Sequence, residues 1–346
     1  MENYVILDER IGEGTFGTVM KGKHLKTEEI VALKQIRIKH SELKQGELPK
    51  AALNEARTLE HVKGHPNILG IHDIFAYGSA MIVALDFAKT DLAKVMKECK
   101  RPLSESTIKC FLRQILRGIA HCHKHNVMHR DIKPANILVS PTGQLKIGDF
   151  GLATVYMGPQ QTYSHCVATR WYRAPELLYG SITYDPKVDI YAIGCIFVEM
   201  LNGCPLFPGD SDIDQLRRVI TAFGVQNEES WPGVSKLPDY DKILFDRNTK
   251  PMSWSELVPN ASPQARDLLS HLCVCDPAKR YSAKEALLHP YFYSEPLPIH
   301  YTQIPYQQLA PRAWGNDTTL CDDDEIKPKR EPLESILAQP FQWPAL

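Results

Sequence analysis

The chain has 346 residues, a net charge of −1 and 43% hydrophobic side chains. It is long enough to bury substantial cores, and its near neutrality predicts neither nucleic acid nor an acidic membrane surface as a partner. The charged first ten residues predict no secretory leader, and the longest apolar stretch, residues 190–201, is too short for membrane insertion. Nine scattered cysteines are then expected to be free thiols in a reducing compartment, cytoplasmic or nuclear.

Residues 4–87 are predicted to contain short strands and one helix. Leu48-Pro49 marks the expected start of that helix, because proline suits a first helical turn and apolar residues recur behind it at helical spacing. The predicted strands cover residues 5–7, 18–20, 30–36, 68–74 and 81–85.

Beyond Asp91 the chain is predicted to be mainly helical, with Ser104 capping a long first helix. Residues 206–257 are rich in Pro, Gly and Trp and are interpreted as loops. Residues 293–346 carry many prolines and an acidic run, which indicate an extended or disordered tail. Further helices are expected at residues 191–201, 263–275 and 283–288.

Four potential metal ligands gather at the end of the first long helix: His121, Cys122, His123 and His125. Packing and solvation of a helix end is the favoured interpretation over a zinc site, since no second ligand pair follows at zinc-site spacing.

A glycine-rich turn, I-G-E-G-T-F-G-T-V, lies between two predicted strands. Glycines let backbone N–H groups approach phosphate oxygens closely. A Rossmann turn shares this spacing but opens a helix, whereas a strand follows here; a plain hairpin is the other alternative. The residues predicted to cover a nucleotide are Ile11, Gly12, Glu13, Gly14, Thr15, Phe16, Gly17, Thr18 and Val19.

Ala32 and Lys34 are expected on one face of a strand, where the small residue leaves room for a flat ring and the lysine can reach phosphates. Glu55 falls on the apolar side of the predicted helix. A buried carboxylate needs a cationic partner, and Lys34 is the expected one.

The most informative stretch combines H-R-D-I-K-P-A-N at residues 129–136 with G-D-F-G at residues 148–151. It holds two carboxylates, an ammonium group and a carboxamide in a fixed order, which suits two magnesium ions, a nucleotide γ-phosphate and an attacking hydroxyl. Two unrelated polar turns are the alternative, which the ordered upstream motifs disfavour.

With these motifs in order, the chain resembles the eukaryotic protein kinase family over residues 4–292. Ala174-Pro175-Glu176 matches the end of the family's activation segment, Asp189 the brace of its catalytic loop, and Arg280 the buried partner of Glu176. The resemblance implies an α+β fold with a β-rich N-lobe (about 4–87) and a larger helical C-lobe (about 88–292).

The resemblance also assigns roles. Asp131 orients the substrate hydroxyl, Lys133 neutralises the γ-phosphate of ATP and implies a Ser or Thr acceptor, and Asn136 and Asp149 hold Mg2+. Phe150 and His129 are expected to stack with Leu59 and Ile71. The remaining ATP contacts are Ala32 above the adenine and Leu138 below it, Leu85 behind it, the backbone of Asp86, Phe87 and Ala88 beside it, and Asp91 at the ribose.

The segment T-Y-S-H-C-V-A-T-R-W-Y-R-A-P-E resembles the cyclin-dependent and mitogen-activated kinases. In that group Arg173 buttresses the substrate floor near Val167 and Ala168. A strained carbonyl there favours proline, which has no N–H, so the implied substrates carry Ser-Pro or Thr-Pro.

Departures from the group concern activation. Ser164 stands in place of the activating phosphothreonine, and of the three arginines that clamp the phosphate only Arg130 is present, with Asn54 and Thr154 in the other places. We hypothesise that activity depends less on Ser164 phosphorylation than in relatives. Phe16 replaces a tyrosine, so inhibitory phosphorylation there is excluded.

The helix carrying Glu55 resembles a degraded cyclin-binding helix, so a cyclin, a non-cyclin activator or none remain open. Segments 201–209 and 287–292 resemble the cell-cycle-related kinase subfamily, which implies control of cilium or flagellum length and other kinases as substrates. A kinase-shaped scaffold and a small-molecule kinase are the alternatives. The basic cluster 327–330 is interpreted as solvated tail over a nuclear address.

Overall fold

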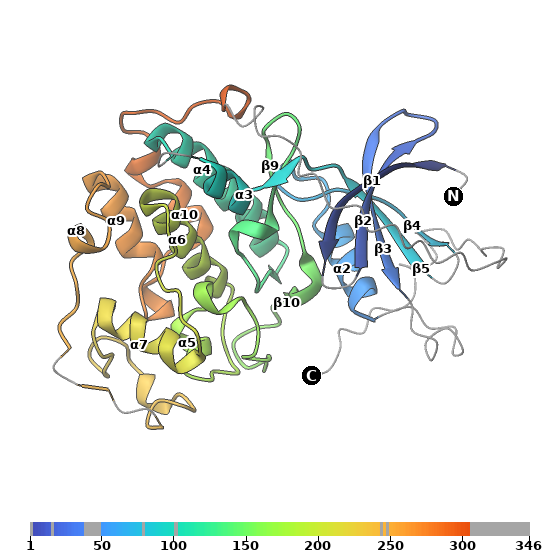
Figure 1. Cartoon of the computed structure of the whole chain (residues 1–346). Coiled ribbons are helices and arrows are strands. Elements are labelled where there is room, and N and C mark those ends of the chain that lie inside the picture. The colour runs from blue at the N-terminus through green and yellow to red at the C-terminus, as the bar shows by residue number, and fades with distance from the viewer. Residues whose placement is uncertain are drawn as a thin grey trace.

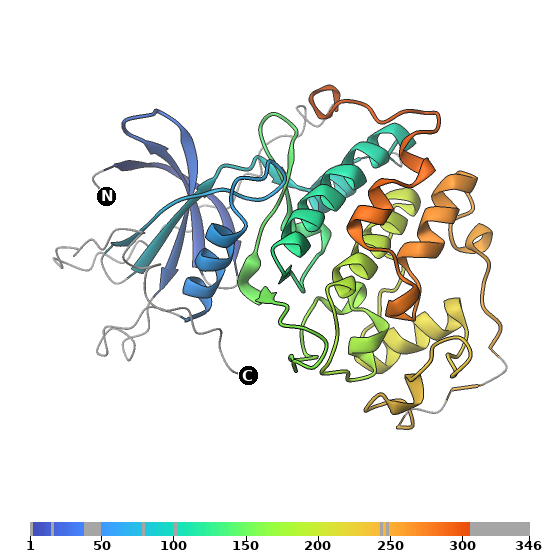
Figure 2. The ribbon, with the colours of Figure 1, turned by 180° about the vertical axis from the view of Figure 1, so that it is seen from behind.

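The computed structural model describes residues 3–14, 17–37, 50–77, 80–99, 103–242, 245–246 and 249–304. A β-sheet with one helix forms a small lobe, and the helices α4, α6 and α9 form the body of a larger lobe beside it (Figure 1). The two expected lobes are therefore present. The 3-10 helix η1 (Pro134–Asn136) and the short strands on either side of the predicted catalytic stretch lie between them (Figure 2).

The N-lobe sheet is antiparallel, with strand order β1-β2-β3-β5-β4. Apolar residues alternate along β3: Val31 and Leu33 pack on one side of the sheet, whereas Ala32 and Ile36 join the main core on the other. At Gly17 a side chain is impossible, because a Cβ would lie 1.7 Å from the Gln35 carbonyl oxygen. The strands are β1 (Tyr4–Gly14), β2 (Gly17–His24), β3 (Ile30–Arg37), β4 (Ile71–Tyr77) and β5 (Ala80–Asp86).

Helix α2 (Lys50–His61) covers the sheet on the side facing the C-lobe and packs against the short 3-10 helix η2 (Phe150–Leu152). The predicted start at Leu48-Pro49 lies outside the described residues. The predicted strand at 68–74 starts later, at Ile71, because Ile68 makes a parallel bridge to Ile147 of the C-lobe.

The C-lobe is built around α4 and α6, and α6 is buried on nearly all sides. Ser104 caps α4 as predicted, its side chain accepting a hydrogen bond from Thr107 N at 3.3 Å. The α-helices are α3 (Leu92–Glu98), α4 (Glu105–Lys124), α5 (Pro175–Leu178), α6 (Lys187–Asn202), α7 (Asp212–Phe223), α8 (Trp254–Leu257), α9 (Pro263–Leu272) and α10 (Ala283–Leu287).

Two small sheets lie where the lobes meet, in the orders β10-β7 and β6-β8-β9. They hold the ends of the catalytic stretch in place, because β7 precedes it and β8 and β9 follow it. Their strands are β6 (Thr90–Asp91), β7 (Val127–Met128), β8 (Ile137–Val139), β9 (Leu145–Ile147) and β10 (Thr154–Val155). Further 3-10 helices are η1 (Pro134–Asn136), η3 (Arg170–Tyr172), η4 (Val234–Lys236), η5 (Pro277–Lys279), η6 (Pro290–Phe292) and η7 (Tyr301–Gln303).

Two helix predictions need correction. The sequence predicts residues 206–257 to be loop-rich, without a helix, but α7 occupies twelve of them and the short α8 lies at their end. Ser211 caps α7, and Leu216, Val219 and Ile220 bury its apolar side. The helix predicted at 263–275 ends at Leu272, so Cys273 and Cys275 are buried beyond its end.

Residues 293–304 of the predicted tail lie along α4. The buried Lys109 Nζ donates to the carbonyl oxygens of Ser294 at 2.8 Å and Pro296 at 3.0 Å, and Ile304 is buried. The rest of the tail, with its acidic and basic runs, lies outside the described residues.

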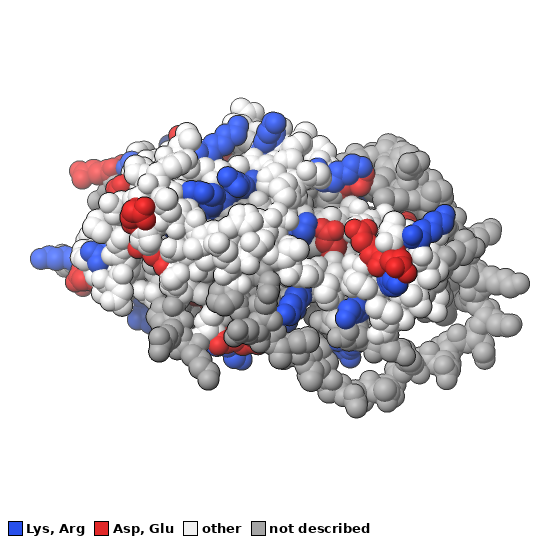
Figure 3. Space-filling model, turned by 90° about the horizontal axis from the view of Figure 1, so that it is seen from above, with Lys and Arg blue, Asp and Glu red and all other residues white. Residues whose placement is uncertain are grey.

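The surface seen from above carries Lys and Arg side chains interspersed with Asp and Glu (Figure 3). This mixture of signs matches the net charge of −1. Within the described ranges, none of the helices combines the length and apolarity needed to cross a lipid bilayer.

Candidate active site

Lys34 of β3 and Glu55 of α2 form the ion pair that the sequence predicts. Lys34 Nζ lies 2.8 Å from Glu55 Oε1 and 2.7 Å from Oε2, and both residues are buried. A buried pair with both oxygens engaged holds the lysine in one direction. It also fixes α2 in the position that brings the helix against the C-lobe.

The residues predicted to hold adenine come from the N-lobe sheet and from β8. Ala32 and Leu85 are register partners on β3 and β5 and are both buried, whereas Ile11, Val19 and Leu138 are partly buried beside the same core.

The described residues of the glycine-rich turn form the β1-β2 hairpin, with Gly14 paired to Gly17. Thr15 and Phe16 lie outside the described residues.

The sequence predicts that backbone groups of residues 86–88 bind adenine. One of these groups already makes a hydrogen bond within the protein. The amide of Asp86 donates to the Gly70 carbonyl at 2.9 Å, so the prediction narrows to the remaining groups of Asp86, Phe87 and Ala88. Asp91 caps α3 by accepting from Lys94 N at 2.9 Å; its contact with a ribose stays a prediction.

The catalytic loop is held from beneath by Asp189, which is almost fully buried in the first turn of α6. Its carboxylate accepts from the backbone amides of His129 at 2.9 Å and Arg130 at 2.8 Å, and from His123 Nε2 at 2.9 Å. Burial alone would raise the pKa of Asp189, but these hydrogen bonds outweigh it and lower the pKa. The brace implied by the family resemblance is thus present, with His123 as an additional donor.

Histidines at the end of α4 serve packing, as the sequence interpretation favoured. His121 Nε2 contacts the Val62 carbonyl at 3.0 Å, and His125 Nδ1 contacts the His121 carbonyl at 2.8 Å. The ring of His129 contacts that of Phe150 edge-on, with ring centres 4.7 Å apart and an angle of 64° between the ring planes. Phe150 and Leu59 are both buried in the main core and Ile71 is partly buried beside it; their stacking into one apolar column stays a prediction.

Asp131 is the centre of a hydrogen-bonded group in the catalytic loop. Its Oδ2 lies 2.7 Å from Lys133 Nζ and 3.0 Å from Asn136 Nδ2. Its Oδ1 accepts from both the backbone N and the Oγ1 of Thr169, at 2.9 and 2.8 Å, and Thr169 Oγ1 also lies 3.0 Å from Lys133 Nζ. The carboxylate is therefore fixed from four directions.

Thr169 is the functional residue that the sequence reasoning missed. It lies 38 positions after Asp131 and joins it only when the activation segment folds back over the catalytic loop. Neither periodicity nor a local motif carries that contact, although Thr169 is part of the T-R-W-Y-R run on which the resemblance was based.

Asn136 and Asp149 fit a magnesium ion chemically. The amide nitrogen of Asn136 donates to Asp131, to its backbone oxygen at 2.8 Å and its Oδ2, which leaves the amide oxygen of Asn136 as a potential ligand. Gly148 N donates to the Asn136 carbonyl at 2.9 Å and so ties the residue before Asp149 to Asn136. Amide and carboxylate oxygens are the ligands that Mg2+ prefers.

The activation segment, residues 149–176, is anchored at its end by the buried pair Arg280–Glu176, with distances of 2.8 and 3.0 Å. Upstream, Arg173 donates through Nε to the Val167 carbonyl and through Nη2 to the Ala168 carbonyl, both at 2.9 Å. Ala168 has a φ of 65°, a left-handed conformation unusual for a residue with a side chain. The strained backbone that the family resemblance implies is thus present at Ala168, and the Ala168 carbonyl accepts a hydrogen bond from Arg173.

Arg130 is engaged by neutral partners. Its Nε donates to the Leu152 carbonyl at 2.8 Å and its Nη1 to the Tyr184 hydroxyl at 3.0 Å, and that hydroxyl donates to the Ser164 carbonyl at 2.6 Å. Asn54, in place of a second arginine, donates to the Ala153 carbonyl at 3.3 Å. Thr154 pairs with Met128 in the β10-β7 sheet.

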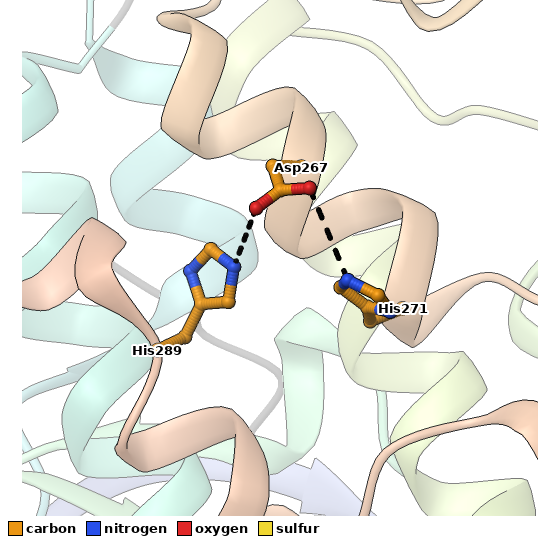
Figure 4. A group of neighbouring side chains, drawn as sticks. All are labelled: Asp267, His271 and His289. Atoms are coloured by element: carbon orange, nitrogen blue, oxygen red, sulfur yellow. Dashed lines mark hydrogen bonds and ion pairs between the residues drawn. The ribbon is translucent and has the colours of Figure 1, made fainter.

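A separate group of potential metal ligands, Asp267, His271 and His289, lies in the C-lobe away from the catalytic loop (Figure 4). His289 Nδ1 accepts from Tyr291 N at 3.2 Å, so its Nε2 carries the proton that it donates to Asp267 Oδ2 at 3.0 Å. A metal-bound imidazole would need the opposite tautomer, with an N–H facing the Tyr291 N–H. The group is therefore a hydrogen-bonded link between α9 and η6.

Comparison with known proteins agrees with this geometry. The protein kinase domain family matches residues 5–292. Cyclin-dependent kinase 20 from Danio rerio is 46% identical, over 89% of this chain and 88% of its own length, and that from Homo sapiens is 44% identical over 99% of both. A chain in the structure of the CAK complex from Chaetomium thermophilum bound to ATP-gamma-S is 31% identical, with a TM-score of 0.79, covering 87% of this chain and 94% of that one.

The chain therefore belongs to the protein kinase family, in its cyclin-dependent kinase branch. It is an ATP-using serine/threonine protein kinase whose fold has the β-sheet N-lobe and helical C-lobe of that family.

Proposed function

We propose that this kinase is proline-directed and that Asp131, Lys133 and Lys34 carry the transfer of phosphate to a Ser-Pro or Thr-Pro site. Lys34, aimed by Glu55, binds the α- and β-phosphates of ATP. Lys133 is 2.7 Å from Asp131, where it can neutralise the γ-phosphate next to the acceptor hydroxyl. Asn136 and Asp149 would hold Mg2+, which supplies charge neutralisation on the phosphates.

Asp131 acts by orientation. Thr169 and Asn136 fix both of its oxygens, so the acceptor hydroxyl meets a carboxylate with a set direction, which makes the hydroxyl a better nucleophile toward an in-line phosphoryl group. The acceptor proton is drawn toward Asp131 as the new O–P bond forms, while the ADP oxygen leaves on the opposite side.

One observation carries the specificity for proline: the Ala168 carbonyl accepts from Arg173 Nη2 at 2.9 Å while Ala168 has a φ of 65°. A substrate residue placed against this backbone finds its nearest acceptor occupied. An ordinary residue after the acceptor would leave its N–H without a partner on binding, which costs about 1–3 kcal/mol. Proline has no N–H and avoids that loss.

A peptide series tests this directly. Matched peptides would carry Ser-Pro, Ser-Ala and Ser-(N-methyl-alanine), the last lacking both the ring and the N–H. We expect kcat/KM to be about tenfold or more lower for Ser-Ala, with substantial recovery for N-methyl-alanine, because the N–H is what is penalised. Equal kcat/KM for Ser-Pro and Ser-Ala would refute proline direction.

Activation is proposed to depend only weakly on phosphate at Ser164. Support comes from the Arg130–Tyr184–Ser164 chain of hydrogen bonds, which orders the segment through neutral partners, and from the formed Lys34–Glu55 pair. The altered sequence of α2 leaves three possibilities open: a cyclin, a non-cyclin activator or no activator.

A role in cilium or flagellum assembly and in the cell cycle, with the protein in the cytoplasm, nucleus or cilium and other kinases among its substrates, is proposed on the subfamily resemblance. The rival hypothesis is a scaffold that acts without turnover. Cells carrying Lys34→Ala in place of the wild type would separate the two: loss of normal cilium length favours catalysis, whereas full function favours scaffolding.

A further inference from the structure

The side chain of Asp86, the last residue of β5, makes contacts that its predicted backbone role does not require. Its Oδ2 accepts from Gly70 N at 2.8 Å and lies 2.8 Å from Lys146 Nζ, and its Oδ1 lies 2.9 Å from His72 Nε2. Three segments thus converge on one carboxylate at the start of residues 86–88, the connection between the lobes, which we call the hinge.

The partners come from both lobes. His72 is on β4 of the N-lobe, and Lys146 is the central residue of β9, which packs on α4 of the C-lobe. The stretch just before β4 is paired with β9, because Leu69 N donates to the Ile147 carbonyl at 2.9 Å. The carboxylate therefore joins the end of β5 to one strand of each lobe, β4 and β9.

Gly70 leaves the space that the Asp86 carboxylate fills, because it has no side chain. A Cβ at residue 70 would lie 2.8 Å from Asp86 Oδ2, 2.9 Å from Oδ1 and 3.0 Å from Cγ. The backbone of residue 70 also accepts from Asp86 N at 2.9 Å. Backbone and side chain of Asp86 are thus both bound by Gly70, and any larger residue there must displace the carboxylate.

The electrostatic interactions favour the contacts of the Asp86 carboxylate with His72, Lys146 and Gly70. Burial opposes ionisation of Asp86, but hydrogen bonds from His72, Lys146 and the Gly70 amide outweigh it and hold its pKa well below the usual range. The hydrogen bond to Asp86 in turn raises the pKa of His72 against the effect of burial; Glu29 adds to the rise and Lys146 opposes it. The side chains of Asp86 and Lys146 are only 22% and 18% exposed, so water screens their pairing weakly.

We propose that the Asp86 carboxylate is a positioning residue for ATP: with His72, Lys146 and Gly70 it fixes the hinge backbone, so that the adenine-binding groups of residues 86–88 are in place before the nucleotide arrives. This rests on the proposed placement of adenine at the hinge. Preorganised backbone groups bind without further ordering, so the cluster acts on nucleotide affinity and leaves the reacting groups at Asp131 untouched.

Steady-state kinetics of the full chain test the inference. Asp86→Asn keeps the shape but removes the charge; we expect KM for ATP to rise about fivefold or more, with kcat within twofold and KM for a Ser-Pro peptide unchanged. Lys146→Met should raise KM for ATP in the same way. Glu28→Gln, which removes an exposed ion pair with Lys23 at 2.9 Å on the same lobe, is the matched control and should change none of these values.

A double-mutant cycle separates positioning from general damage. Gly70→Ala should raise KM for ATP when Asp86 is present but add little in an Asp86→Ala background, where the obstructed carboxylate is absent. Additive effects, or a fall in kcat equal to the rise in KM, would overturn the inference.

Ala88→Pro, which deletes a hinge N–H, distinguishes the two proposals. If it raises KM for ATP while Asp86→Asn does not, adenine lies at the hinge and only the positioning role of Asp86 is refuted. If neither variant raises it, the placement of adenine is refuted along with the role of Asp86.

Discussion

The guanidinium of Arg173 lies 2.9 Å from the carbonyl oxygen of Ala168, the residue with a left-handed backbone in the substrate floor. This contact keeps the strained conformation in place and removes an acceptor from the substrate site. On the proposed function, it links a local backbone feature to the choice of residue that follows the phosphorylated Ser or Thr.

Replacing Arg173 by Gln should relax this choice. The Val167 and Ala168 carbonyls lose their donor, so the ratio of kcat/KM for Ser-Pro over Ser-Ala peptides is expected to fall about tenfold, mainly through better use of Ser-Ala. Asp212→Asn is the control, because it removes the negative charge that pairs with Arg173 Nη1 at 2.8 Å, while both carbonyl contacts remain. An unchanged ratio in Arg173→Gln would contradict the assignment.

Ser164→Ala should retain most of the activity, since Arg130 is held by Leu152 and Tyr184 without a phosphate. Tyr184→Phe should lower kcat/KM about five- to tenfold, because it deletes the hydroxyl that joins Arg130 to the Ser164 carbonyl. The test is the rate of each purified variant on one Ser-Pro peptide. An inactive Ser164→Ala variant together with a fully active Tyr184→Phe variant would show that activity depends on the Ser164 phosphate and not on the Tyr184 hydroxyl.

Thr169→Val is nearly isosteric but lacks the hydroxyl that contacts Asp131 and Lys133. Loss of a hydrogen bond to a charged carboxylate predicts a fall in kcat of about 10- to 100-fold, with KM for ATP unchanged. Thr169→Ser keeps the hydroxyl and should restore most of the rate. A Val variant as fast as wild type would show that Thr169 has no part in orienting Asp131.

His65 introduces a pH dependence of stability. Burial, followed by the charges of His121, Arg117 and Lys146, lowers the pKa of His65 from 6.5 to about 4. Between these values the unfolded chain binds more protons at this residue than the folded chain, so acidification from pH 6.5 to 4 destabilises the fold. Because the ring is only partly buried, solvent screening limits the effect to about 1 kcal/mol.

Denaturant unfolding at pH 7 and pH 5 measures this effect. His65→Asn keeps an acceptor for the Asn67 amide and should lose less stability than wild type between the two pH values. His300→Asn, at an exposed histidine in the C-terminal segment, should behave like wild type. An identical pH dependence in wild type and His65→Asn would refute the assignment.

Much of the site could be predicted because its signals are local. The Lys34–Glu55 pair followed from strand alternation, helical spacing and the rule that a buried carboxylate needs a cation. The α7 helix also had local signals, the cap at Ser211 and apolar residues at helical spacing, but the surrounding Pro, Gly and Trp concealed them.

What could not be predicted depends on contacts between distant segments. Thr169 meets Asp131 across 38 positions, and Asp86 meets Lys146 across the boundary between the lobes. Such contacts are set by how the two lobes and the activation segment pack, and no spacing within a short stretch encodes them. Sequence reasoning therefore found the orienting contacts that a motif or helical spacing encodes, such as Glu55 and Asp189, and missed those made by Thr169 and by the side chain of Asp86.

Transfer of the γ-phosphoryl group of ATP to a Ser-Pro peptide, compared between wild type and Asp131→Asn at saturating substrates, tests the central claim most directly. The carboxamide keeps the shape of Asp131 but cannot accept the hydroxyl proton, so we predict a fall in kcat of about 100-fold or more with KM for ATP within twofold. Equal phosphate incorporation by the two proteins would contradict it.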